Sequence, residues 1–155
     1  MKIRPAIPHN PCINAGAIMC SSLVMPNAAE DERFDYVMDI WRDLCGYHRN
    51  SNTLRSPTFA NSTYLSERAS ADRNFCLGYM MREEGAFPEG VNIVKALESY
   101  FMYCSIECTV HTLSVVASTF ANGGTCPVTG KVWKGIIVVC CLDVFRFSDF
   151  FQLYR

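Results

Sequence analysis

The feature that most constrains the fold is the number of segments with helical periodicity, set against few candidates for strands. Apolar residues recur every three or four positions, which is the spacing of one buried helix face. In the segment 32–45, Phe34, Val37, Met38 and Trp41 follow it. Helices are predicted at 11–24, 32–45, 66–83, 89–103 and 109–121, and a surface loop at 47–65. The apolar run 135–142 could form a buried strand, so a predominantly helical chain is expected.

Several residues mark where these helices should begin and end. Asn10 and Ser66 are predicted to cap the first and third helices, and Thr109 is predicted to cap the fifth, because short polar side chains accept hydrogen bonds from free N–H groups. Gly46 and the Asn-Gly-Gly stretch 122–124 are predicted to end helices, because glycine tolerates the left-handed conformation found there.

Composition and charge exclude several classes of function. Half of the 155 residues are apolar and 19% are charged, which is typical of a chain with a packed core. The net charge is −1, so there is no basic excess and no nucleic-acid partner is predicted. A membrane-spanning helix needs about 20 apolar residues. The run 135–142 is much shorter, so no membrane partner is predicted, and the first residues lack the apolar stretch of a secretory signal.

The chain has nine cysteines, an odd number that cannot all pair internally. Those in apolar helical segments, such as Cys20, Cys45, Cys76 and Cys104, are predicted to be buried thiols in a reducing compartment. Cys104, Cys108 and His111 would align on a continuous helix, but the cap at Thr109 predicts a break between them. The spacing of known zinc modules is missing, so no metal or other cofactor is predicted.

Four polar residues stand out on otherwise apolar helical segments. Asn14 lies among small residues that permit close approach of a ligand, although it could equally be a buried or capping amide. Glu67 and Asn74 are seven residues apart and would share one face of the predicted helix 66–83. Glu67 could also have a purely structural role, because a negative charge near the start of a helix interacts favourably with the helix dipole. Tyr100 lies on an aromatic face where core packing is the usual explanation.

Motifs for nucleophilic catalysis are absent from the 155 residues. None of the four lysines lies three positions after a serine, so there is no Ser-x-x-Lys motif. There is also no Gly-x-Ser-x-Gly elbow and no Lys-Thr-Gly string, which argues against a penicillin-recognising enzyme.

Four strings nevertheless resemble one family closely. They are HNPCINAGAI at 9–18, SERASADRN at 66–74, YFMYCSIECT at 100–109 and STFANGGTCPVTGK at 118–131. Together they resemble the serine-dependent glutaminases, the family of the kidney- and liver-type animal enzymes and their bacterial relatives. The resemblance implies an α+β fold like that of β-lactamases and transpeptidases, of which this chain would cover the helical part with little of the sheet. It also implies hydrolysis of L-glutamine to L-glutamate and ammonia, without a cofactor.

The resemblance also assigns roles to the four polar residues, by position within the matched strings. Asn14 and Asn74 match asparagines that bind polar groups of the substrate. Glu67 matches the glutamate that pairs with the substrate's α-ammonium group, and Tyr100 matches a tyrosine that lines the pocket. These roles suit the chemistry, because a carboxylate pairs with an ammonium group and amides suit a carboxylate or amide ligand.

The family's nucleophile motif precedes the first string, so no catalytic residue is predicted here and the isolated chain is expected to be inactive. Residues 8–131 are interpreted as a partial glutaminase domain truncated at both ends, and 132–155 as a divergent apolar and aromatic tail. The alternative to an enzyme is a non-catalytic fragment that associates with complete glutaminase subunits and regulates them. By resemblance we expect a homo-oligomer, a dimer or tetramer, and a mitochondrial location, with a cytoplasmic one as the alternative.

Overall fold

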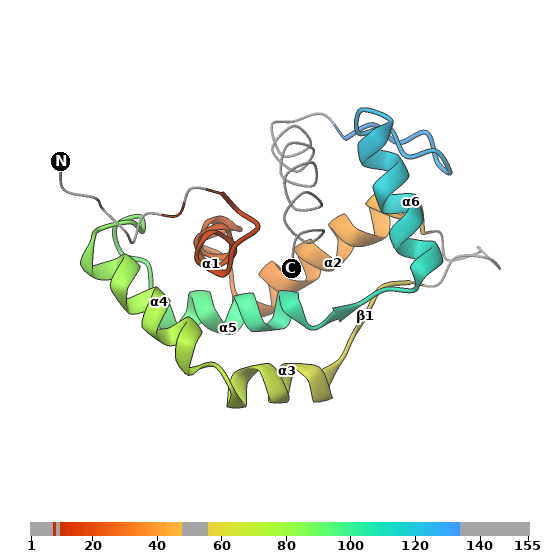
Figure 1. The fold of residues 1–155 in the computed structure, drawn as a ribbon. Coiled ribbons are helices and arrows are strands. Elements are labelled where there is room, and N and C mark those ends of the chain that lie inside the picture. The colour runs from red at the N-terminus through yellow and green to blue at the C-terminus, as the bar shows by residue number, and fades with distance from the viewer. Residues whose placement is uncertain (1–7, 9, 48–55, 134–155) are drawn as a thin grey trace, which may run out of the picture. The chain divides into compact units, whose positions relative to one another are not determined.

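The computed structural model describes residues 8, 10–47 and 56–133, and these residues are mostly helical (Figure 1). The helices are α1 (Asn14–Leu23), α2 (Glu30–Leu44), α3 (Asn61–Ala69), α4 (Asp72–Glu83), α5 (Ile93–Cys104) and α6 (Val110–Ala121). Two short strands, β1 (Thr58–Phe59) and β2 (Ile106–Glu107), pair with each other. The prediction of a predominantly helical chain is therefore confirmed for this part of the sequence.

The chain forms two compact units, and each is built from two separate stretches of sequence. Unit 1 contains the chain up to Phe34 together with Phe59–Ile106. Unit 2 contains Asp35–Thr58 and the chain from Glu107 onward. The four polar residues singled out in the sequence, at positions 14, 67, 74 and 100, all belong to unit 1.

Unit 1 is organised around α5, which packs against α1, α3 and α4. Figure 1 shows α5 between α1 and α3. Leu97 and Phe101 of α5 are completely buried, and they share a core with Ile18 of α1 and with Ala71, which precedes α4. The buried face of α5 is apolar because Ile93, Ala96, Leu97, Tyr100 and Phe101 follow helical spacing.

Unit 2 joins the end of α2 to α6 and to the turn that follows it. The Thr119 hydroxyl donates a hydrogen bond to the Leu44 carbonyl at 2.9 Å. Lys131 pairs with Asp43 at 2.5 Å. The predicted stop at Gly46 is confirmed, since its φ is +67°. An added Cβ there would lie 2.9 Å from the buried Cys126 sulfur, so the site also lacks room for a side chain.

The first predicted helix begins three residues later than expected. The Asn10 side chain accepts hydrogen bonds from the N–H groups of Cys12 and Ile13, at 2.9 and 3.1 Å. It therefore closes a turn before the helix, and α1 starts at Asn14 instead of Pro11. The turn folds back onto α1 so closely that a Cβ on Gly16 would lie 1.8 Å from the Asn10 carbonyl oxygen.

The prediction of one helix over 66–83 is wrong, and so is the role of Ser66 as its cap. The structure has two helices, α3 and α4, and Ser66 lies inside α3. The break follows from burial of Ala71, which is 2% exposed and packs in the core of unit 1. The Ser70 hydroxyl donates to the Ser66 carbonyl as α3 ends, and the Ala71 carbonyl accepts from Asn74 N–H as α4 begins.

The predicted loop 47–65 is also partly wrong, because it contains β1 and the first residues of α3. The predicted last helix is confirmed: Thr109 caps α6 by accepting from Thr112 N–H at 3.1 Å. The strand candidate 135–142 and nearly all of the predicted tail 132–155 lie outside the described residues. Within the parts of the chain that are described, no helix has the length and apolar character needed to cross a membrane.

The burial predicted for the cysteines is right at one of the four named positions. Cys45 is buried, but Cys20, Cys76 and Cys104 are exposed. The spacing of apolar residues alone did not reveal this exposure.

Candidate functional site

The structure brings two of the predicted residues into direct contact. Asn14 is the first residue of α1, and Asn74 lies in the first turn of α4. The Asn14 side-chain amide donates a hydrogen bond to the Asn74 side-chain oxygen at 3.0 Å. These residues are 60 positions apart, so the contact depends on the packing of α1 against α4. It leaves the Asn14 oxygen and the Asn74 NH₂ group available to a ligand.

Glu67 offers a negative charge that no cation neutralises within the described chain. Its side chain is exposed on α3. The neighbouring Arg68 instead donates to Glu98 of α5 at 2.9 Å. Glu98 also accepts a hydrogen bond from the Tyr64 hydroxyl at 2.7 Å. Arg68 is thus engaged by Glu98, and the Glu67 carboxylate remains able to pair with a positively charged ligand.

Tyr100 contributes a buried hydroxyl close to this carboxylate. The residue is 8% exposed and belongs to the core of unit 1. Burial raises the pKa of Tyr100 well above its ordinary value, and the neighbouring Cys104 sulfur and the negative charge of Glu67 raise it further. The phenol therefore stays neutral at physiological pH and can act as a hydrogen-bond donor.

Cys104 follows Tyr100 by one helical turn and is the third member of this group. The Cys104 sulfur lies close enough to the Tyr100 hydroxyl to influence its pKa. Cys104 is exposed by surface area, yet atoms around the sulfur remove enough water to raise the pKa of the thiol, and Glu67 raises it too. The thiol is therefore protonated near neutral pH. A protonated thiol is a poor nucleophile, so Cys104 is better suited to a polar contact with Tyr100.

The four predicted residues form two pairs in the same unit. Asn14 contacts Asn74, and the charge of Glu67 acts on Tyr100. The prediction that Glu67 and Asn74 share one helix face is wrong, because Glu67 lies on α3 and Asn74 on α4. The turn at Ala71 separates these helices, so the two residues are placed by packing against α5 and α1 instead of by helical spacing.

Sequence reasoning missed the residues that support Glu67. Glu98, Arg68 and Tyr64 form one hydrogen-bonded group between α3 and α5. Arg68 and Glu98 are 30 positions apart. No local pattern links them, and their pairing follows only from the contact of the two helices. The i, i+4 spacing of Tyr64 and Arg68 on one helix face was the available signal.

No group of three metal-binding side chains lies together among the residues the structure describes. The predicted break between Cys104 and His111 is confirmed: α5 ends at Cys104, β2 follows, and α6 begins at Val110. These residues therefore do not align on one continuous helix.

Known proteins with solved structures share this fold. A crystal structure of Mglu in its L-glutamate binding form, in 4.3 M NaCl, superposes with a TM-score of 0.75 at 31% identity. The match covers 88% of this chain and 29% of that chain. A second Mglu structure gives a TM-score of 0.73 at 32% identity. The fold of these proteins is β-lactamase-like, and this chain corresponds to a mostly helical part of it.

Sequence comparisons agree with the structural ones. Residues 1–136 match the family described as Glutaminase. The mitochondrial liver isoform of glutaminase from Rattus norvegicus is 43% identical over 125 residues, which are 81% of this chain and 20% of the rat protein. The glutaminase of Clostridium tetani is 35% identical over 142 residues, which are 86% of this chain and 43% of that protein. The chain belongs to the glutaminase family, and it spans less than half the length of these relatives.

Proposed function

We propose that this chain provides the amino-acid-binding part of a glutaminase, an amidohydrolase that converts L-glutamine to L-glutamate and ammonia. The observation that carries the proposal is the unneutralised Glu67 carboxylate beside Tyr100, in the same unit as the bonded asparagines 14 and 74. A free amino acid offers one ammonium group, one carboxylate and, in glutamine, one side-chain amide. These residues offer the complementary charge and amides.

In this proposal each residue has a separate task. Glu67 pairs with the α-ammonium group of the substrate. The Asn14 and Asn74 amides hold each other in place and use their remaining donors and acceptors on polar groups of the substrate. Tyr100 forms one wall of the substrate site and presents its neutral hydroxyl there. A bound ammonium group would lower the pKa of Tyr100, because it would cancel the nearby negative charge of Glu67.

Hydrolysis of the glutamine side-chain amide needs a nucleophile. In this family the nucleophile is the serine of a Ser-x-x-Lys motif, and the 155 residues contain no such motif. We therefore propose that the 155 residues bind the amino acid and do not turn it over. Ammonia release from L-glutamine by the purified chain, compared with a boiled sample, should stay at background. Release well above background would show that another nucleophile operates here.

The binding role is tested with L-glutamine and two variants of the 155-residue chain. E67Q removes the charge and keeps the shape, so binding should weaken at least about tenfold, which corresponds to roughly 1.4 kcal/mol. E83Q changes another glutamate of unit 1, at the exposed end of α4, and should bind like the unchanged chain. Isothermal titration calorimetry measures both. Equal affinities of E67Q and the unchanged chain would remove the role given to Glu67.

The missing nucleophile motif supports a second candidate function, which is association with complete glutaminase subunits as a dimer or tetramer. Mixing this chain with the rat liver isoform should then give a heavier species in analytical ultracentrifugation and change the turnover of L-glutamine. An unchanged sedimentation profile would argue against this function. The rat relative is mitochondrial by name, so a mitochondrial location is proposed by analogy and is tested by imaging a tagged chain.

A further inference from the structure

A pocket of about 370 Å³ lies in unit 1 at the opposite end of α1 from Asn14. Its walls come from the end of α1, the connection to α2, the loop before α5 and the first turn of α5. Much of the lining is apolar, contributed by Leu23, Pro26, Pro88, Val91 and Ala96. Its size is at the lower end of the range for small-molecule sites, which are usually apolar with a few polar groups.

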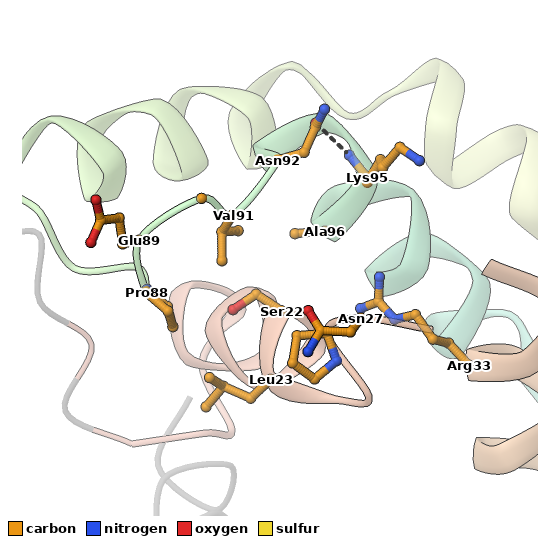
Figure 2. A pocket seen from close by; sticks show the side chains of 12 residues that line it. Ser22, Leu23, Asn27, Arg33, Pro88, Glu89, Val91, Asn92, Lys95 and Ala96 are labelled. Carbon is orange, nitrogen blue, oxygen red and sulfur yellow. Dashed lines mark hydrogen bonds between the residues drawn. The ribbon is translucent and has the colours of Figure 1, made fainter. Parts of the chain in front are cut away.

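One buried cation faces this pocket. Arg33 of α2 is 6% exposed. Figure 2 shows its guanidinium group extending toward the space between Ala96 and Asn27. The other two charged lining residues do not compete with it. In Figure 2 the Glu89 carboxylate and the Lys95 ammonium group point away from the centre of the pocket, and Lys95 pairs with Glu30 at 3.1 Å.

The charge of Arg33 is only partly compensated. Its Nε donates to the Val24 carbonyl at 2.9 Å, and one Nη donates to the Ser21 carbonyl at 2.6 Å. These carbonyls lie at the negative end of α1, which contributes about half an elementary charge. No carboxylate pairs with Arg33 within the described residues. A guanidinium group has five N–H donors, so the carbonyls leave part of its donor capacity unused.

The polar groups beside Arg33 do not supply the missing negative charge. The Tyr103 and Ser99 hydroxyls are buried, and neither has a hydrogen-bond partner with good geometry within the described chain. Burial raises the pKa of Tyr103, although the charge of Arg33 partly opposes this, so the phenol is neutral at physiological pH. A buried charge without a full counter-charge is costly, and a bound anion would lower that cost.

We propose that this pocket binds a small organic carboxylate. The carboxylate would pair with the free N–H groups of Arg33, and a short aliphatic body would pack against Leu23, Val91 and Ala96. Guanidinium and carboxylate groups match in shape, which favours a bidentate pair. The pocket is separate from the candidate site, because none of the four candidate-site residues lines it and it lies at the opposite end of α1, a helix about 15 Å long, from Asn14.

The test uses the 155-residue chain and three probes followed by NMR: pentanoate, its neutral analogue pentanamide, and inorganic phosphate. Pentanoate should shift the resonances of Val91 and Ala96 with a millimolar Kd. Pentanamide should bind at least tenfold more weakly because it lacks the charge. Equal binding of pentanamide would overturn the role of Arg33, and equal binding of phosphate would overturn the role of the apolar wall. No shifts at about 50 mM pentanoate, well above a millimolar Kd, would overturn the proposal.

Four variants make the result specific. R33Q should lose pentanoate binding, but Arg33 also caps α1, so this variant could unfold. A96L keeps Arg33 and adds bulk to the pocket wall, so it should lose binding; because Ala96 is also buried, circular dichroism checks that the variant is folded. R82Q removes an exposed arginine of the same unit and should bind normally. E67Q should also bind pentanoate normally, which separates this site from the proposed glutamine site. Unchanged binding by A96L would place the ligand elsewhere.

Discussion

Gly16 lies where the backbone of α1 touches the preceding turn, and it has no room for a side chain. A Cβ there would lie 1.8 Å from the Asn10 carbonyl oxygen, which is a backbone atom that cannot move alone. Alanine inside a helix is usually more stable than glycine by about 0.5–1 kcal/mol. We expect the opposite for G16A, a loss of about 2–3 kcal/mol in the free energy of unfolding.

Urea denaturation of G16A measures this loss, and G78A is the matched control. Gly78 is also a buried helical glycine, but its added Cβ would meet the side chains of Ile93 and Leu97 at 3.2 and 3.3 Å. Side chains can shift by a few tenths of an ångström, so G78A should change stability by less than about 1 kcal/mol. If G16A is as stable as the unchanged chain, the close contact with Asn10 does not exist in solution.

Tyr100 should make the stability of the chain fall at alkaline pH. Its pKa is raised in the folded state, chiefly by burial, so the folded chain keeps a proton that the unfolded chain releases near pH 10. Stability from this group is complete below pH 10 and decreases as pH rises above it, by at most about 1.4 kcal/mol per pH unit. In Y100F nothing ionises at this position, so the slope should be smaller.

The measurement is the free energy of unfolding between pH 9 and 11 for the unchanged chain, Y100F and Y79F. Tyr64 and Tyr103 also have raised pKa values, through the Glu98 hydrogen bond and burial respectively, so part of the slope should remain in Y100F. Tyr79 is 43% exposed, so Y79F serves as a control with an unchanged slope. Identical slopes for all three proteins would contradict the burial of the Tyr100 hydroxyl.

At the scale of elements, the turn at Ala71 decides how α3 and α4 are placed. Ala71 is 2% exposed in the core, whereas Ala69, two residues earlier, is exposed. A71L would overfill the core and should lower the free energy of unfolding by about 1–3 kcal/mol. A69L should have little effect. Thermal unfolding of the two variants compares them directly, and equal melting temperatures would mean that the turn does not depend on burial of Ala71.

Helix type and several helix ends were predictable from sequence, because they depend on local spacing and capping. The cap at Thr109 and the stop at Gly46 are examples. The break at Ala71 was not predictable, because alanine is a strong helix former and only contacts with α1 and α5 bury it. The same holds for the candidate site. Its four residues were predicted from the matched sequence motifs. The Arg68–Glu98 pair, which leaves Glu67 unneutralised, was not predictable because it depends on contact between α3 and α5.

At the scale of the molecule, burial should decide which cysteines react. Cys12 and Cys76 are exposed, whereas Cys45 and Cys126 are buried. Burial disfavours the Cys126 thiolate, but hydrogen bonds from Thr129 and from the backbone outweigh it and lower the pKa of the thiol, which alone would favour reaction. We expect iodoacetamide to label Cys12 and Cys76 in the native chain, and Cys45 and Cys126 only in denaturant. Peptide mass spectrometry checks this, and native labelling of Cys126 would contradict its burial.

Each unit is built from two separate stretches of the chain, and this affects when unit 1 can fold during synthesis on the ribosome. Unit 1 begins with α1, but α3, α4 and α5 follow only after the chain has passed through part of unit 2. Its core therefore cannot close until α5, which supplies Leu97 and Phe101, has been synthesised. Until then Ile18, which is fully covered in the folded chain, has no core to join. We therefore expect chaperones that bind apolar segments to recognise the nascent chain during translation.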